Sequence, residues 1–221
     1  TTTELRAFSE TQIGALAATQ VTRLSAAQIA GLAGTQLAAL DATQVATLST
    51  TQIAAISTAA IGSLTTDQLA GLTATQFAAL TALEMGSLAE TQIATLADTR
   101  IAALTSTQIR GLGTEGVAAL TATQIAALTT TQLGALSRSQ LAALADTQAA
   151  ALGTAGVAAL AATQIAALST TGLEALTTAQ IGALSTTQIA ALPATQTGEL
   201  RATQLAALST SQNAALTTPE I

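Results

Sequence analysis

The sequence predicts an all-α solenoid, a superhelical coil of very short helices with one helix in each eight-residue repeat. Three observations predict this fold. One eight-residue unit, repeated about 27 times, accounts for the chain of 221 residues. Each typical unit opens with a helix-capping signature. Each also carries two large aliphatic residues three positions apart, which share one face of a helix. We therefore expect residues 1–221 to form a single repeat array, excised from a longer one.

The register of the repeat never slips. With position 1 at the first residue, every position 8 from residue 8 to residue 216 is Leu, except Phe8 and Ile56. Position 5 is aliphatic, Met or Phe in nearly every unit, although Ala149 is small and two later units carry polar residues. Position 4 is mostly Gln, and positions 6 and 7 are mainly Ala or Gly. The consensus of this unit, called the octad below, is [ST]-x-T-Q-I-A-A-L.

The period of eight decides between three backbone conformations. A continuous α-helix advances about 100° per residue, so the aliphatic pair would drift about 80° per octad and wind around the whole surface. A β-solenoid would place positions 5 and 8 on opposite sides of a strand and would need Ala and Gln to pair, although both are indifferent strand formers. It remains the alternative. A short helix in every octad, with a turn between octads, agrees best with the local signals.

The helices are expected to begin at a capping box. Ser or Thr at position 1 and Gln at position 4 can satisfy each other's unpaired backbone N–H groups. The clearest predicted caps are Ser49, Gln52, Thr121, Gln124, Thr129, Gln132, Ser185 and Gln188. Each cap also ends the preceding helix, which leaves about six or seven residues, or about 10 Å, per helix. Six octads begin with Ala and have Thr at position 3, so position 3 is an alternative cap there.

Positions 5 and 8 are expected to fill a common core. The predicted core residues are Ile13, Leu16, Leu24, Ile29, Leu32, Leu40, Leu48, Ile53, Ile125, Leu128, Ile165, Leu168, Ile189 and Leu192. Because isolated helices of this length are marginal, they must stack cooperatively along the array. We expect about three or four octads per turn, with small residues at positions 6 and 7 allowing close contact between turns.

A few octads depart from the consensus. The octads at 113–120 and 153–160 have Gly at positions 1 and 4. They are interpreted as tolerated variants in which Gly caps the helix, in preference to hinges or ligand notches. Pro193 stands at an octad boundary, where a broken helix accommodates it. Thr197 and Asn213 place polar side chains at core positions, which predicts local weakening more than a binding role.

The composition excludes several classes of function. Charged residues make up 8% of the chain, the net charge is -6, and the chain has no His, Lys or Cys. Nucleic-acid binding needs a clustered positive surface, so we do not expect it. Ser or Thr nucleophiles have no His or Lys base, and the acidic residues are scattered, so we expect no enzyme, cofactor or metal site. Every apolar run is too short to span a membrane.

The octads TTQIAAL, ATQIAAL and TAQIGAL resemble tandem repeats of long secreted bacterial surface proteins of the adhesin or RTX type. The resemblance implies an extracellular spacer or adhesive stalk, although the calcium-binding nonapeptides of RTX proteins are missing. The LT-x-x-Q openings are also similar to transcription-activator-like effector repeats, which are longer and basic. Alternatives are an array that binds ice or polysaccharide through rows of Thr and Gln, and a fibre that self-associates through the array ends.

Overall fold

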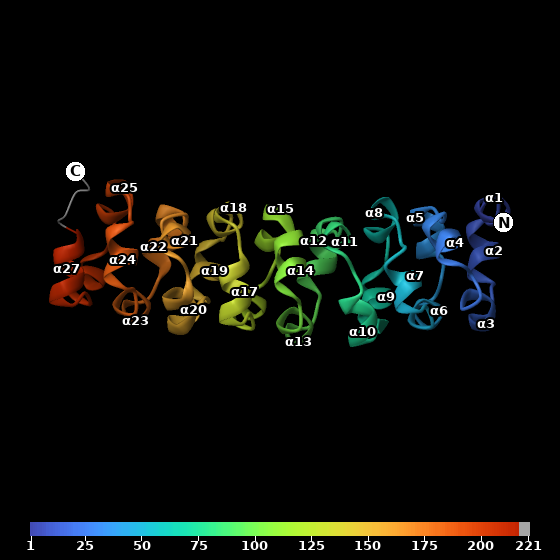
Figure 1. The fold of residues 1–221 in the computed structure, drawn as a ribbon, viewed down its shortest axis with the longest axis horizontal. Helices are drawn as coiled ribbons and strands as arrows, with labels where there is room; N and C mark the ends of the chain where they lie inside the picture. The colour runs from blue at the N-terminus through green and yellow to red at the C-terminus, as the bar shows by residue number, and fades with distance from the viewer. Residues whose placement is uncertain (217–221) are drawn as a thin grey trace. The chain divides into compact units, whose positions relative to one another are not determined.

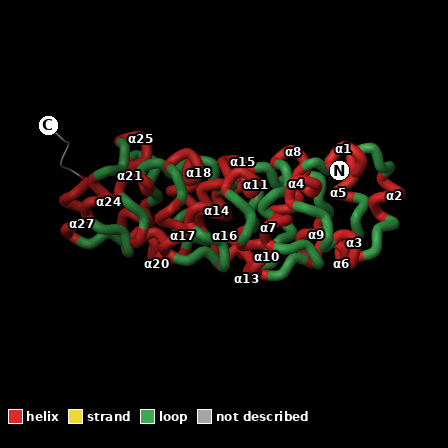
Figure 2. Tube along the Cα trace, turned by 45° about the vertical axis from the view of Figure 1, so that its right-hand side comes forward, coloured by secondary structure: helices red, strands yellow, loops and turns green. Residues whose placement is uncertain are grey.

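The computed structural model describes residues 1–216 of the chain, and these residues form short α-helices joined by short loops (Figure 2). No strand occurs among them, so the all-α solenoid is confirmed and the β-solenoid alternative is wrong for this part of the chain. Within residues 1–216, no helix is both long and apolar enough to cross a membrane.

The contacts divide the chain into two compact units, Thr1–Leu112 and Gly113–Ile221. The helices of the first unit are α1 Thr2–Arg6, α2 Glu10–Gly14, α3 Ala18–Val21, α4 Ala26–Ala30, α5 Gly34–Ala38, α6 Ala42–Ala46, α7 Thr50–Ile53, α8 Thr58–Ile61, α9 Thr66–Gly71, α10 Ala74–Ala78, α11 Ala82–Gly86, α12 Glu90–Ala94, α13 Asp98–Ala102 and α14 Ser106–Gly111. Those of the second are α15 Gly113–Ala118, α16 Ala122–Ala126, α17 Thr130–Ala135, α18 Arg138–Ala142, α19 Asp146–Ala150, α20 Gly153–Ala159, α21 Ala162–Ile165, α22 Thr170–Ala175, α23 Thr178–Gly182, α24 Thr186–Ala190, α25 Ala194–Thr197, α26 Ala202–Ala206 and α27 Thr210–Leu216. One octad therefore supplies one helix.

The helices are mostly shorter than predicted. They span four residues, as in α7, to seven, as in α20. In most octads the last turn tightens: the Leu128 N–H donates to the Ile125 carbonyl at 3.1 Å, an i to i−3 bond of the 3₁₀ type. This turn satisfies one orphan carbonyl at the helix end and brings position 8 onto the face of position 5.

In the octads that begin with Ala, position 3 does not replace position 1 as the cap. Ala161 has the extended conformation of an N-cap residue, and α21 begins at Ala162. The alternative in which position 3 takes over as the cap is therefore wrong here. The reason is that half of the capping box survives, because the Ala161 N–H still donates to Oε1 of Gln164 at 2.7 Å. Position 3 is left inside the first turn.

Within each unit, most helices pack against the helix three octads further along. In the first unit α2 contacts α5, and α6 contacts α9; in the second, α17 contacts α20, and α19 contacts α22. In the first unit of Figure 1, α1, α5, α8 and α11 follow one edge, and α3, α6, α10 and α13 follow the other. The intervals are four, three and three octads along the first edge, and three, four and three along the second. One turn of the coil therefore takes between three and four octads.

Positions 5 and 8 line the core of each unit, as their side chains are buried in nearly all octads. Of the fourteen predicted core residues, Leu16 and Leu24 are only half-buried, which corrects their assignment. Phe8 is 39% exposed for the same reason. These residues belong to the first turn, and no turn precedes it here to cover their side chains.

Two glycines replace the usual extended cap. Gly113 has a φ of 69° and Gly153 a φ of 68°, and α15 and α20 begin at these residues. The prediction of an ordinary Gly cap was wrong, because the chain enters both helices through the left-handed conformation that favours glycine. Asn213, predicted at a core position, is exposed. Thr197 is half-buried, and its Oγ1 donates to the Ala194 carbonyl at 3.1 Å.

Candidate functional site

The residues predicted as caps form reciprocal bonds. Oγ of Ser185 accepts from the Gln188 N–H at 3.1 Å, and Oε1 of Gln188 accepts from the Ser185 N–H at 2.7 Å. Each of these bonds satisfies a backbone donor at the start of α24 that no carbonyl of the helix can reach. The other predicted pairs form the same box: Ser49 with Gln52, Thr121 with Gln124, and Thr129 with Gln132.

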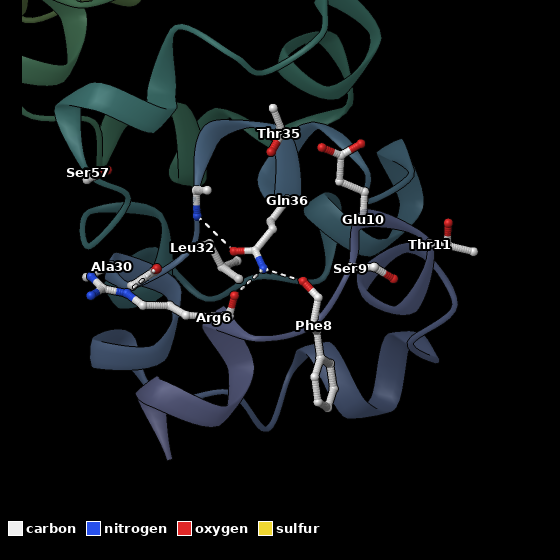
Figure 3. Close-up of a pocket in the computed structure, with 12 residues that line it drawn as sticks. Arg6, Phe8, Ser9, Glu10, Thr11, Ala30, Leu32, Thr35, Gln36 and Ser57 are labelled. Carbon is white, nitrogen blue, oxygen red and sulfur yellow. Dashed lines mark hydrogen bonds between the residues drawn. The ribbon is translucent and has the colours of Figure 1, made fainter.

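The position-4 glutamine has a second role that the sequence interpretation missed. Nε2 of Gln188 donates to the carbonyls of Val157 at 2.8 Å and Leu160 at 2.7 Å, which lie one turn earlier. Figure 3 shows the same arrangement at Gln36, whose Nε2 reaches the carbonyls of Arg6 and Phe8. We call this pair of interactions the glutamine clasp: Oε1 bonds to position 1 of its own octad, and Nε2 bonds to carbonyls of the preceding turn.

The Nε2 half of the clasp recurs at constant spacing in both units. Nε2 donates to the carbonyl 28 residues earlier, at 2.5–3.0 Å, from Gln36, Gln44, Gln52, Gln68, Gln76, Gln92, Gln108, Gln148, Gln164, Gln188, Gln196, Gln204 and Gln212. The acceptor is always position 8 of the octad four units back. A separation of 28 residues equals 3.5 octads, in keeping with a turn that takes between three and four octads.

The acceptors are the carbonyls that a helix leaves unpaired at its C-terminal end. Gln204 donates to the carbonyls of Leu173, Glu174 and Leu176, the last residues of one octad, at 2.8–3.1 Å. Its side chain is fully buried. One amide thus caps the start of its own helix and the end of a helix one turn away. A buried amide without hydrogen-bond partners would cost about 1–3 kcal/mol of stability. The Gln204 amide can therefore be buried only because these carbonyls accept its hydrogen bonds.

Two side chains other than Gln occupy position 4 with incomplete bonding. Arg100 uses one terminal nitrogen to reach the carbonyls of Ala70, at 3.0 Å, and Leu72, while its other terminal nitrogen, NH1, is buried without a partner. Glu84 is 2% exposed; one carboxylate oxygen accepts from the Thr81 N–H at 2.5 Å, and the other, Oε1, has no partner. A carboxylate oxygen cannot donate as Nε2 does.

The hollow drawn in Figure 3 lies between the first and second turns of the first unit. Its volume is about 870 Å³, and it is lined by Arg6, Phe8, Ser9, Glu10, Thr11, Ala30, Gly31, Leu32, Ala33, Thr35, Gln36 and Ser57. Nε of Arg6 donates to the Gly31 carbonyl at 2.8 Å, and Gln36 forms its clasp there. Two of its polar side chains, Arg6 and Gln36, are therefore used for packing between turns. Over residues 1–216, His, Cys, Asp and Glu form no group of three or more that could hold a metal ion.

Position 3 is a second hydroxyl-bearing position, which caps no backbone N–H and takes no part in the clasp; in four octads its hydroxyl bonds to the cap hydroxyl, as Thr123 does with Thr121 at 2.9 Å. It is exposed in every octad up to residue 211, and it is Thr in 18 of those 27 octads. Thr187 follows Thr186 at the start of α24, where Ser185 provides the cap. The structure thus separates two kinds of hydroxyl that look alike in the sequence.

These features define an α-helical repeat protein whose turns are joined by buried amide side chains. The chain belongs to the ALTTAQ repeat family: the family model matches residues 49–82, 93–130 and 157–201, which together make 117 of the 221 residues. The hexapeptide that gives the family its name stands at residues 175–180 and ends on the clasp residue Gln180. No curated protein matches the chain.

Proposed function

We propose that this repeat array is a non-catalytic structural spacer of a secreted bacterial surface protein of the adhesin type. The observation that carries the proposal is the glutamine clasp. The position-4 Gln is the most regular polar side chain of the octad, and in the clasp it forms its hydrogen bonds inside the array. This side chain therefore holds neighbouring turns together. A spacer needs this property, because its work is to keep a distance under load.

The clasps give each turn a set of bonds that breaks when the turns separate. Gln148, Gln188 and Gln204 each reach two or three carbonyls of the preceding turn. A net hydrogen bond contributes about 0.5–1.5 kcal/mol, and the stability of a repeat array is approximately a sum of local and nearest-neighbour terms. Such an array would lengthen stepwise under tension and re-form when the tension falls.

Single-molecule stretching of the complete chain between two handles tests this function. A variant without clasps carries Leu at Gln148, Gln164, Gln188 and Gln204. The matched control carries Val at the exposed position 3 of the same four octads, Thr147, Thr163, Thr187 and Thr203. We expect reversible extension of the native chain, a lower force for the variant without clasps, and an unchanged force for the control. Equal forces for the two variants would refute the mechanical role of the clasps.

The extracellular placement rests on the resemblance of the octads to those of secreted bacterial surface proteins. Protease added to intact cells that produce the full protein should cleave the array, whereas a cytosolic marker should survive. Protection of the array until the cells are lysed would contradict this part of the proposal.

A second candidate function is supported by the exposed Thr residues at position 3, namely binding to a polysaccharide surface. These hydroxyls are accessible in each unit and do not serve as caps. Glycan-binding and thermal-hysteresis assays on the native chain and on the four-site Thr→Val control distinguish this function from a spacer. Binding that the Val residues abolish would favour it, and no binding would leave the spacer as the better account.

A further inference from the structure

Two departures from the octad consensus meet at one place in the first unit. Phe77 is the one aromatic residue at position 5 in residues 1–216, and Arg100 is the one Arg at position 4 there. They are 23 residues apart, yet the guanidinium carbon of Arg100 lies 5.4 Å from the centroid of the Phe77 ring. In a repeat this regular, two unique residues in mutual contact mark a local specialisation.

A pocket of about 260 Å³ opens beside this pair. Its walls are Ala74, Phe77, Ala78, Thr99, Arg100, Ala103, Leu104 and Gln108, contributed by α10, α13 and the chain up to α14. At about 30 Å³ per water molecule, this volume is equivalent to roughly nine non-hydrogen atoms. The alanine, leucine and phenylalanine side chains make the walls mostly apolar, and Arg100 supplies the charge.

The charge of Arg100 is not compensated within the described chain. Its NH2 group replaces the amide of a glutamine clasp by reaching the carbonyls of Ala70 and Leu72, whereas NH1 is buried without a partner. Among residues 1–216, no carboxylate forms an ion pair with it. Gln92 and Gln108 make the same contacts with the preceding turn as neutral side chains, so the turn contact does not require a cation. A partly buried charge is unfavourable unless it is paired.

We propose that this pocket binds a small organic monoanion of about nine non-hydrogen atoms, in which a carboxylate is joined to a flat apolar body. The carboxylate pairs with the Arg100 guanidinium, which turns slightly to bring NH1 to the pocket, and the apolar body packs against Ala74, Ala78 and Leu104. Arginine and carboxylate form paired, charge-assisted hydrogen bonds, and removal of a buried apolar surface from water adds to them. The proposal does not depend on the spacer function.

Benzoate is the test ligand, because it combines one carboxylate with a flat ring in nine non-hydrogen atoms. Benzyl alcohol is the uncharged control of similar shape, and acetate is the charged control without the ring. Each is titrated into the complete isotope-labelled chain while amide NMR shifts are recorded. We expect saturable shifts with benzoate at residues 74–78 and 99–104, and at least tenfold weaker binding with either control.

Two variants restore the consensus residues, so both should fold. Arg100→Gln should form an ordinary clasp, retain the helical circular dichroism spectrum and weaken benzoate binding at least tenfold. Phe77→Ile should weaken it less, since it changes the shape of the pocket and leaves the charge. The proposal is overturned if benzoate gives no saturable shifts, if Arg100→Gln binds it as tightly as the native chain, or if benzyl alcohol binds equally well. Shifts of the same size around Arg201 would also overturn it, because they would indicate non-specific binding.

Discussion

Replacing Glu84 by Gln should stabilise the first unit, because it supplies the donor that this octad lacks. Glu84 is buried, it forms the capping half of the clasp with Thr81, and its Oε1 has no partner. In the following octad, Nε2 of Gln92 donates to the Leu64 carbonyl at 2.5 Å, 28 residues earlier. The same spacing assigns the carbonyl of Ile56 to position 84. Glu84→Gln should therefore form this bond without any change of side-chain length.

The magnitude follows from two contributions. A buried polar atom without a partner costs about 1–3 kcal/mol, and a new hydrogen bond contributes about 0.5–1.5 kcal/mol net. Since Glu84→Gln removes the first and gains the second, we expect the local free energy of unfolding to rise by about 1.5–4.5 kcal/mol. In native-state hydrogen exchange this corresponds to at least roughly tenfold slower exchange of amides in α11.

The reverse change serves as the matched control. Gln188→Glu removes the donor that reaches Val157 and Leu160, so amides of α24 should exchange faster by a similar factor. If Gln188→Glu weakens its octad while Glu84→Gln leaves exchange in α11 unchanged, the assignment of the clasp at position 84 is refuted.

Four further predictions concern glycines and caps, each checked by thermal and urea unfolding. Gly153→Ala should destabilise the second unit by about 1 kcal/mol, because Gly153 has a φ of 68°. Gly134→Ala, in a helix where the added Cβ meets no atom within 4 Å, should stabilise it by about 0.5–1 kcal/mol, and a loss there would contradict the argument. Gly86→Ala should cost about 1–3 kcal/mol because its Cβ would lie 2.6 Å from a backbone carbonyl oxygen of the next turn; an unchanged midpoint would mean that the turns separate easily. Ser185→Ala should cost about 1 kcal/mol and Ala161→Ser should gain up to as much, and equal signs would show that the hydroxyl cap is unimportant.

The helix-per-octad fold could be predicted because its signals are local. The cap at Ser185 needs only Gln188, three residues away, and Ile189 and Leu192 share a face by helical geometry alone. Because the register never slips, the same local signals predict a helix in every typical octad. Leu16 and Leu24 are only half-buried although they stand at position 8. Burial also depends on a neighbouring turn that packs over the side chain, and the position within an octad does not specify that turn.

The clasp depends on the pitch of the coil, which no single octad contains. One signal was nevertheless present. A capping box accepts Glu as readily as Gln, yet 20 of the 27 octads to residue 216 have Gln at position 4 and two have Glu. Only Gln can donate, so this preference indicates a second partner. The identity of that partner could be read only from the three-dimensional structure of the coil. The same holds for the contact between Phe77 and Arg100, because these residues stand at different positions of octads three apart.

The spacing of 28 residues also bears on the choice between a spacer and a recognition surface. One turn takes between three and four octads, so the same position of the octad does not return to the same side of the coil after a single turn. The exposed Thr residues of successive octads within either unit therefore point in different directions and do not form one flat row. A surface lattice such as ice requires a flat row, whereas a spacer requires only that every turn be held to the previous one. Because a turn does not take a whole number of octads, the arrangement favours a spacer. A change in the behaviour of the chain with the position-3 Thr→Val control, and none with the loss of the clasps, would instead favour a recognition surface.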